Sequence, residues 1–408
     1  MDLQIIPKKL SGAVTPPPSK SQAHRLLIAA ALSGGVSVLH GLAESQDIQA
    51  TRRCLSALGA GIEDLPDGGL RIHGLGNSVV QAGPAPILDC GESGSTLRFF
   101  IPIALAVAGG GIFTGHGRLM ERPQGPYFQL FDKKGIFYDQ KDGVLTVRGA
   151  LTPGEYVLPG NVSSQFFTGL LFALPLLDGV SAVVSSTEIE SREYITMTLE
   201  AMRLAGVPVA ERPGLRSFEV LHAAYQPFEA TVEADWSQAG FWYAANFLDS
   251  QVEIRGLDPD SAQGDKVVSE LYWRLARPGD AEIDVSGCPD LLPPLAVMAA
   301  VRSGVTRFTH AARLRMKESD RLSTITAALA ALGAKVHEEP DRLIIVGKPS
   351  LPGGTVDSAN DHRIAMMAAI AATGCTGPVT IRGAECVQKS YPDFWEVYRS
   401  LGGDIHVL

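Results

Sequence analysis

Cysteine is scarce in this 408-residue chain, and the few that occur are scattered. They are odd in number and form no C-x-x-C pair: Cys54, Cys90, Cys288, Cys375 and Cys386. Disulfide-stapled secreted domains and zinc ribbons both need cysteines at paired spacings. The pattern excludes both classes and favours a reducing compartment, so we expect the protein in the cytoplasm.

Motifs for metals, nucleotides and hydrolytic nucleophiles are also missing. The nine histidines form neither H-x-x-x-H nor H-E-x-x-H, and no acidic calcium loop occurs. The chain has no G-x-x-x-x-G-K-[ST] loop, no strand-to-helix G-x-G-x-x-G and no G-x-S-x-G elbow. We therefore expect no metal and no cofactor.

Long hydrophobic runs and an excess of positive charge are absent too. The longest uncharged runs, 99–117 and 364–381, are broken by glycine clusters or Pro378, which predicts buried helices with their turns rather than membrane spans. A formal net charge of −9 offers no general attraction to nucleic acid. The N-terminus lacks a signal-peptide pattern. We expect no membrane, no nucleic-acid partner and no export.

The chain does contain a pattern that recurs six times. A polar cluster rich in Ser, Gly, Asp or Asn precedes an apolar helical stretch of about a dozen residues. The six clusters begin at Ser19, Gly91, Gly160, Ala234, Gly287 and Ser358. Between them lie second helices with small-residue stops, and β-branched runs such as 144–147 and 343–346. The repeating unit is therefore an α/β segment of about seventy residues.

Six units predict two domains of three units each. The interval from Ala234 to Gly287 is the shortest and follows Pro227, which places the domain boundary near residue 232. The strand expected at 3–6 precedes the first repeat and can complete the C-terminal half. The prediction is one domain of residues 1–17 plus 233–408 and an inserted domain of residues 18–232.

Cationic side chains lie in or beside the polar clusters, although the chain as a whole is acidic. A helix N-terminus presents unpaired N–H groups and a partial positive charge, which suits an anion. For any single cluster, ordinary N-capping is the better explanation. The set of cations favours a binder of multiply anionic small molecules: Lys20, Arg25, Arg98, Arg122, Lys317, Arg321, Arg363 and Lys389.

Four acidic or histidine positions remain open between structural and chemical roles. In RLRMKESDRL, Asp320 can be a helix cap and Glu318 can form a solvated ion pair with Lys317. Asp290, in the CPD segment, can cap the following helix or act as a base. His362 can be a structural hydrogen-bonding group or a proton carrier.

Six motifs, by their order and spacing, resemble the EPSP synthase (3-phosphoshikimate 1-carboxyvinyltransferase) family over nearly the whole chain. They are PSKSQAHRLLIAAAL at 18–32, ERP at 121–123, VSSQF at 162–166, LRMKESDRL at 314–322, DHRIAM at 361–366 and KSYPDFW at 389–395. The resemblance implies an α/β fold (α+β by some schemes), a two-domain inverted α/β barrel-like arrangement. It implies six βαβαββ-type repeats, three per domain, and an active site in the cleft between the domains.

The reaction implied by this resemblance is enolpyruvyl transfer. The 5-hydroxyl of shikimate 3-phosphate adds to phosphoenolpyruvate, and inorganic phosphate leaves through a tetrahedral intermediate. The expected product is 5-enolpyruvylshikimate 3-phosphate, on the pathway to chorismate and the aromatic amino acids. Both substrates are anionic, which agrees with the cationic set, and a monomer is the expected state.

The resemblance also implies residue roles. Asp290 is expected as the base for the 5-hydroxyl and Glu318 as the proton donor, with Lys20 and His362 assisting. Shikimate 3-phosphate is expected at Lys20, Ser21, Arg25, Ser163, Ser164, Gln165, Ser191, Tyr194, Asp290 and Lys317. Phosphoenolpyruvate is expected at Lys20, Gly94, Arg122, Gln165, Arg321, Arg363 and Lys389. The chain departs from the common family pattern at Glu92 and Phe99, and no role is assigned to Arg313 or Arg98.

Two other functions stay open. A UDP-N-acetylglucosamine enolpyruvyl transferase would share the fold and co-substrate, but it usually has a reactive cysteine in a mobile loop. The corresponding segment here, RLMERPQGP at 118–126, contains none. A non-catalytic anion-binding protein is the second alternative, and it predicts binding without turnover.

Overall fold

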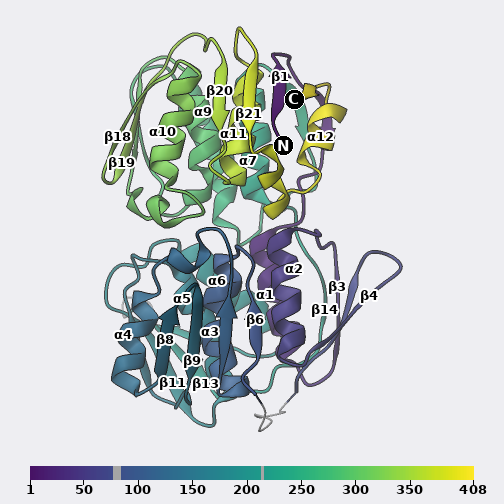
Figure 1. Ribbon diagram of the computed structural model, residues 1–408, viewed down its shortest axis with the longest axis vertical. Coiled ribbons are helices and arrows are strands. Elements are labelled where there is room, and N and C mark those ends of the chain that lie inside the picture. The colour runs from purple at the N-terminus through teal and green to yellow at the C-terminus, as the bar shows by residue number, and fades with distance from the viewer. Residues whose placement is uncertain (77–83, 213–215) are drawn as a thin grey trace. The chain divides into compact units, whose positions relative to one another are not determined.

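The structure is a computed structural model that describes residues 1–76, 84–212 and 216–408. Contacts between residues divide the chain into two compact units. Unit 1 comprises Met1–Pro17 and Glu233–Leu408, and unit 2 comprises Pro18–Val232. Figure 1 follows the chain by colour through both units.

Unit 2 is built from three sheets and their helices. Its helices are α1 (Lys20–Leu32), α2 (Gln46–Ala57), α3 (Gly94–Ala108), η1 (Leu119–Glu121), α4 (Gly125–Lys134), α5 (Ser164–Ala173), η2 (Leu174–Leu176) and α6 (Arg192–Leu204). Its strands are β3 (Val36–His40), β4 (Gly61–Asp64), β5 (Leu70–His73), β6 (Ile87–Asp89), β7 (Gly110–Thr114), β8 (Phe137–Lys141), β9 (Val144–Arg148), β10 (Glu155–Leu158), β11 (Val180–Ser185), β12 (Ala210–Arg212), β13 (Ser217–Leu221) and β14 (Glu229–Thr231).

Unit 1 contains the N-terminal strands together with the second half of the chain. Its helices are α7 (Trp236–Phe247), η3 (Gly264–Val267), α8 (Val268–Ala276), η4 (Pro289–Leu291), α9 (Leu292–Val301), η5 (Ala312–Met316), α10 (Arg321–Ala331), α11 (His362–Ala372), η6 (Ala384–Lys389) and α12 (Phe394–Ser400). Its strands are β1 (Leu3–Ile6), β2 (Ser11–Val14), β15 (Gln251–Ile254), β16 (Ala281–Asp284), β17 (Val305–Thr309), β18 (Lys335–Glu339), β19 (Arg342–Val346), β20 (Gly354–Asp357), β21 (Val379–Arg382) and β22 (Asp404–Val407).

The sheets repeat one topology, which confirms the predicted α/β repeats. In the order β6-β7-β9-β8, the first pair is parallel and the next two pairs are antiparallel. The sheets β10-β11-β13-β12 and β16-β17-β19-β18 have the same order and the same directions. Each of these three units reads strand, helix, strand, helix, strand, strand along the chain, as a βαβαββ unit should.

Two further four-stranded sheets have this pattern but borrow a strand from elsewhere in the chain. In β14-β3-β5-β4, the parallel partner of β3 is β14, from the end of unit 2. In β20-β21-β1-β22, the N-terminal strand β1 lies between β21 and β22 and is antiparallel to both. Figure 1 shows β1 beside the chain terminus that follows β22.

The repeat that begins at Ala234, the fourth in the sequence, keeps the first four elements of the βαβαββ unit and lacks the final hairpin. Its sheet contains only β2 and β15, paired in parallel. No hairpin lies between α8 and β16 in this part of the described chain. The missing hairpin explains why the interval from Ala234 to Gly287 is the shortest of the five in the sequence.

The first helix of each repeat is buried on nearly all sides. In α11 every residue is buried, and α9 is buried from Leu292 to Ala300. In unit 1, α7, α9 and α11 contact one another, and Figure 1 shows them close together. In unit 2, α3 packs most closely on α5, where a Cβ added at Gly169 would lie 2.5 Å from Tyr127 Oη and 2.6 Å from the Arg98 carbonyl. Helices that are apolar on all sides therefore form both cores. Their polar N-termini are available to form binding or catalytic sites.

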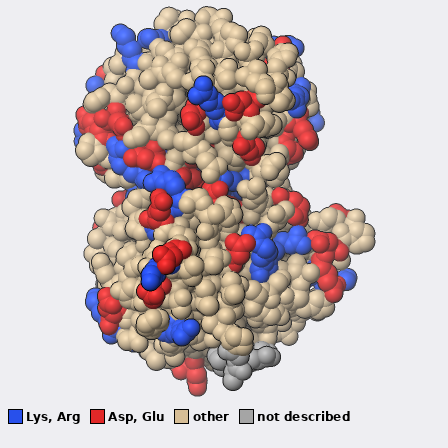
Figure 2. All heavy atoms as spheres, viewed as in Figure 1, with Lys and Arg blue, Asp and Glu red and all other residues tan. Residues whose placement is uncertain are grey.

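Most of the polar clusters are helix N-caps. Ser19, Ser93, Ser163, Asp235 and Asp361 each accept a hydrogen bond from a backbone N–H in the first turn of the helix that follows. The run 99–117 is α3 with β7, and the run 364–381 is α11 with β21. No helix among the described residues has the length and apolar character that a membrane crossing requires. In the face shown in Figure 2, Lys and Arg are interspersed with Asp and Glu.

Candidate functional site

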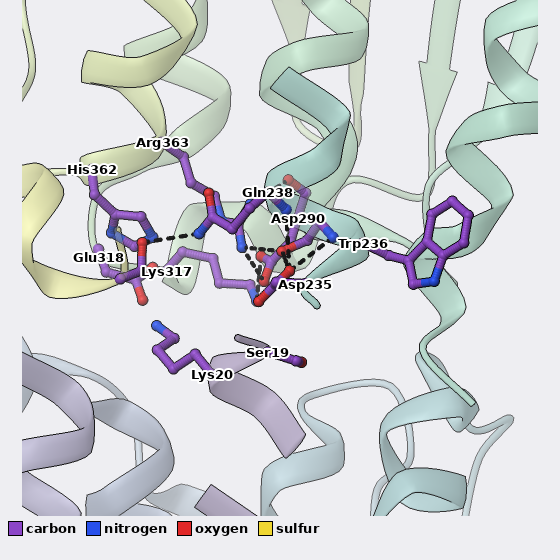
Figure 3. Close-up of polar contacts among 12 residues, drawn as sticks. Ser19, Lys20, Asp235, Trp236, Gln238, Asp290, Lys317, Glu318, His362 and Arg363 are labelled. Atoms are coloured by element: carbon purple, nitrogen blue, oxygen red, sulfur yellow. Dashed lines mark hydrogen bonds and ion pairs between the residues drawn. The ribbon is translucent and has the colours of Figure 1, made fainter. Parts of the chain in front are cut away.

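In unit 1 the N-termini of four helices bring a set of charged side chains together. Asp290 lies in η4 just before α9, Arg321 begins α10, and Arg363 is in the first turn of α11. Ser237 is in the first turn of α7. Figure 3 shows the labelled side chains of this cluster pointing toward one another. The chain thus collects four polar helix starts, from segments far apart in sequence, at one place.

Arg321 is the centre of this cluster. Its side chain is 1% exposed, and its guanidinium contacts three carboxylates. Nη1 donates to Asp290 Oδ1 at 2.7 Å, Nη2 donates to Glu318 Oε2 at 2.8 Å, and Nε donates to Asp361 Oδ2 at 2.9 Å. Burial lowers the pKa of Arg321, but the three carboxylates outweigh it and raise the pKa above its usual value. The Arg321 guanidinium therefore stays positively charged, and the carboxylates of Asp290 and Glu318 both bind to it.

Two more cationic groups lie close to the carboxylate of Asp290. Lys317 Nζ and Arg363 Nη2 each lie 3.3 Å from an oxygen of its carboxylate. The Arg363 guanidinium also donates to the Asp290 carbonyl at 3.1 Å and to Ser237 Oγ at 2.8 Å. Burial lowers the pKa of Lys317, and Asp290 acts in the opposite direction. The N-cap residue of α9 is Leu291, which makes no side-chain hydrogen bond.

The contacts of the neighbouring charges are also defined. Asp320 is the N-cap of α10 and accepts from the backbone N–H of Ser323. The sequence suggested a solvated ion pair between Lys317 and Glu318. In the structure, Lys317 contacts Asp290 and Glu318 contacts Arg321. Glu318 is thus part of a largely buried charge cluster rather than a surface pair.

Asp361 is the third carboxylate that contacts Arg321, and the sequence reasoning missed it. It is fully buried, caps α11 through the Arg363 N–H at 3.0 Å, and accepts from Ser319 Oγ at 3.0 Å. His362 Nδ1 lies 4.0 Å from its Oδ1. Burial raises the pKa of Asp361, but the Arg321 guanidinium outweighs it and lowers the pKa below its usual value. The signal in the sequence was the aspartate directly before the His-Arg pair, which was interpreted as part of a motif rather than as a contact.

This lowered pKa predicts how acid weakens unit 1. A group whose pKa is lower in the folded state stabilises the protein above its unfolded pKa, here 3.8, and this stabilisation is lost as the pH falls through the folded value. We expect Asp361→Asn to lower the free energy of unfolding at pH 7. The difference from wild type should shrink as the pH falls below about 4, because Asp361 is protonated first in the unfolded chain and only at lower pH in the folded one. Urea unfolding at several pH values checks this, and a difference that stays constant down to pH 3 would contradict it.

Lys389 completes the predicted residues of unit 1. Its side chain is buried at the end of η6, and Nζ donates to the Asn360 carbonyl at 2.6 Å. Asn360 and Ala359 both have positive φ just before α11. Non-glycine residues in this conformation are strained and are found at sites the surrounding structure holds in place. Lys389 is therefore tied to the same turn that carries His362 and Arg363.

In unit 2, Arg122 and Gly94 lie against each other at the start of α3. A Cβ added at Gly94 would lie 2.6 Å from Arg122 Cζ, so only glycine allows this approach. Arg122 is 7% exposed, and its buried Nε has no hydrogen-bond partner among the described residues. A buried guanidinium N–H without an acceptor is costly. The arrangement has the properties of an anion site at a helix N-terminus.

Gln165 lies beside this pair, in the first turn of α5. Its Oε1 accepts from Arg98 Nη1 at 2.8 Å, and its Nε2 donates to Ser95 Oγ at 2.9 Å. Ser163 caps the same helix. Ser164 follows it as the first, buried residue of α5.

Arg25 is a second buried guanidinium of unit 2. It donates to the carbonyls of Ser21 and Tyr194, and to Thr198 Oγ1 and Thr168 Oγ1. All these partners are neutral, and burial lowers the pKa of Arg25 to about 10. Its side chain ties α1 to α5 and α6, and its charge is not balanced by a carboxylate among these partners.

The remaining predicted residues lie on the same helix starts. Lys20 begins α1, and its Nζ contacts Asp47 Oδ2 at 2.7 Å. Asp47 was also missed, because an acidic residue in the first turn of α2 is what helix preferences alone would place there. Ser191 precedes α6 with positive φ, and the Tyr194 N–H donates to its carbonyl at 3.2 Å. The predicted residues thus form one group in each unit.

Solved structures with the same architecture define the class of this protein. An EPSP synthase from Acinetobacter baumannii superposes with a TM-score of 0.79 at 25% identity and covers all of both chains. The enolpyruvyl transferase NikO from Streptomyces tendae superposes with a TM-score of 0.77 at 17% identity, over 99% of this chain and 98% of that one. The chain has the fold of the enolpyruvyl transferases.

Sequence comparisons identify the family. The model of EPSP synthase (3-phosphoshikimate 1-carboxyvinyltransferase) matches residues 5–398. Relatives named 3-phosphoshikimate 1-carboxyvinyltransferase include those of Clostridium kluyveri, 44% identical over 99% of this chain and 98% of the relative, and Clostridium beijerinckii, 43% identical over 98% of each. The chain belongs to the EPSP synthase family. It is a transferase, and its reaction is the enolpyruvyl transfer of the shikimate pathway.

Proposed function

We propose that the chain transfers the enolpyruvyl group of phosphoenolpyruvate to the 5-hydroxyl of shikimate 3-phosphate, with Asp290 and Glu318 as the proton-transfer groups. The observation that carries this assignment is that both carboxylates contact one buried guanidinium, that of Arg321. Acid–base catalysis on two reacting groups needs two carboxyl groups held in a defined relation. A shared rigid cation supplies that relation.

The proton steps follow from the reaction. The 5-oxygen forms a bond to C2 of phosphoenolpyruvate as its proton leaves to Asp290, and C3 gains a proton from Glu318 and becomes a methyl group. In the second step one of the methyl protons passes to Glu318 as the C2–O bond to phosphate breaks. The double bond is restored, and the departing phosphate takes up the proton held by Asp290. Nearby cations favour the ionised form of a carboxyl group, and a base needs that form, so Lys317 and Arg363 suit Asp290 to its role. Lys20 and His362 are proposed to assist.

Phosphoenolpyruvate is proposed to bind a set of cationic side chains and neutral N–H donors. In unit 2 these are Lys20, Arg122, Gln165 and the backbone N–H of Gly94. In unit 1 they are Arg321, Arg363 and Lys389. The support is strongest for Arg122, whose buried Nε has no partner among the described residues. A phosphate or carboxylate oxygen would supply that acceptor, and the guanidinium fork suits both.

Shikimate 3-phosphate is proposed to bind through the other group of residues. Arg25 supports this proposal, because a buried cation with neutral partners gains from an anionic ligand. The further residues of the proposed site are Lys20, Ser21, Ser163, Ser164, Gln165, Ser191, Tyr194, Asp290 and Lys317.

We propose a monomer in the cytoplasm. All five cysteines are buried free thiols, which suits a reducing compartment. One chain carries every residue of the proposed site. Light scattering during size-exclusion chromatography tests the monomer, and a mass of twice 43.3 kDa would overturn it.

The reaction is tested by phosphate release. The purified chain is mixed with phosphoenolpyruvate and shikimate 3-phosphate, with UDP-N-acetylglucosamine as the parallel acceptor. Release that depends on shikimate 3-phosphate supports the proposal. Release with UDP-N-acetylglucosamine alone would reassign the acceptor, and tight binding of either anion without release would indicate a binding protein.

The contact between Gly94 and Arg122 gives a further prediction. Gly94→Ala places a methyl group where the guanidinium lies, so Arg122 must move away from its position. We expect the KM for phosphoenolpyruvate to rise by about 10- to 100-fold, the scale of one lost charge-assisted hydrogen bond. Gly125→Ala is the control, because a Cβ there meets no atom within 4 Å. An unchanged KM in Gly94→Ala would show that Arg122 does not bind this substrate.

A further inference from the structure

Arg98 lies on the same face of α3 as Gly94, whose backbone N–H is proposed to bind phosphoenolpyruvate. It follows Gly94 by four residues and Ser95 by three, which places all three on one side of the helix. Arg98 is 4% exposed, and its guanidinium carbon Cζ lies 4.9 Å from the centroid of the Phe166 ring. The guanidinium therefore packs on an aromatic ring and has a defined position.

The Arg98 guanidinium contacts two elements of the proposed site. Nη1 donates to Gln165 Oε1 at 2.8 Å, and Nη2 donates to the Pro123 carbonyl at 3.1 Å. Pro123 directly follows Arg122, whose own carbonyl accepts from Gln124 Nε2 at 3.2 Å. One side chain thus joins the amide of α5 to the backbone that carries Arg122.

The contact with Gln165 determines which way its amide faces. A guanidinium has donors only, so the oxygen of the amide must face Arg98 and the nitrogen must face away. Ser95 Oγ receives one N–H of that nitrogen at 2.9 Å. The second N–H is left for another acceptor, and an anionic oxygen is a strong one. Without Arg98 the amide could rotate and present its oxygen, which repels an anion.

We propose that Arg98 is a positioning residue for phosphoenolpyruvate, acting through the amide orientation of Gln165 and the backbone next to Arg122. This inference rests on the proposed function of the site. It requires that the effect of removing Arg98 on the KM for phosphoenolpyruvate depend on Gln165. The effects of the two substitutions must therefore be non-additive.

The test is a double-mutant cycle with Arg98→Met and Gln165→Ala, measured by phosphate release. Met keeps much of the packing on Phe166 but has no donor. We expect Arg98→Met to raise the KM for phosphoenolpyruvate by roughly 10- to 100-fold, the range for one lost charge-assisted hydrogen bond, with a smaller change in kcat. In the Gln165→Ala background the same substitution is expected to change the KM much less.

Controls separate this result from loss of fold. Arg148→Met removes a cation from an exposed position of the same unit and is expected to leave both constants unchanged. A purely structural role for Arg98 would lower kcat, through a smaller folded fraction, and leave the KM unchanged, which would overturn the proposal. Additive effects in the cycle would also overturn it, because Arg98 would then act independently of Gln165. A wild-type chain without turnover would instead overturn the proposed function.

Discussion

Asp290→Asn and Glu318→Gln are each expected to reduce turnover by about 10²- to 10⁴-fold, the usual contribution of a general acid or base. Both substitutions keep the size of the side chain and an oxygen that can accept from Arg321. An amide cannot take or give the proton that the reaction moves, so the chemical step should fail while the cluster stays assembled. Phosphate release measures turnover, and calorimetry measures whether shikimate 3-phosphate still binds.

Proton exchange separates the two carboxyl groups. If Glu318 protonates C3 of phosphoenolpyruvate, deuterium from D₂O enters the methylene group when the step reverses. Glu318→Gln should lose this exchange, and Asp290→Asn should retain more of it. Glu339→Gln, on an exposed carboxylate of the same unit, is the matched control and should behave as wild type. Near wild-type turnover in Asp290→Asn, or undiminished exchange in Glu318→Gln, would show that the roles are assigned wrongly.

Arg321→Met is expected to destabilise unit 1 by about 3–5 kcal/mol, the usual cost of removing one partner from a buried ion pair. The substitution leaves Asp290, Glu318 and Asp361 close together without the cation that all three contact. Activity should be lost as well, because the two proposed proton-transfer groups lose their common partner. Urea unfolding gives the stability, and phosphate release gives the activity.

A second substitution tests the physical reason for this loss. Arg321→Met combined with Asp361→Asn removes one of the unpaired negative charges and should recover part of the stability but not the activity. Arg342→Met is the control, since its pair with Glu339 is exposed and such pairs contribute about 0–1 kcal/mol. Equal losses in Arg321→Met and Arg342→Met would show that the three carboxylates do not depend on Arg321.

The repeats and their helices could be predicted because they depend on local sequence. Apolar stretches such as 364–372 have no polar face, so they must be buried, and the serine or aspartate before each one is a helix cap by chemistry alone. The same local reasoning could not find the missing hairpin of the fourth repeat, because a short interval does not say which strands are absent. It could not find Asp361 as the partner of Arg321, since forty positions in the chain separate them.

The role of Asp290 illustrates the division between sequence and structure. By itself, the sequence determined the α/β repeats, the family motifs and the residue types that suit two anionic substrates. It left Asp290 between a cap and a base, and Glu318 between a surface pair and an acid. Only the tertiary structure decided their partners, because the N-termini of α7, α9, α10 and α11 meet through packing of buried helices. Charges that are distant along the chain then share one guanidinium, and no local pattern specifies such a contact.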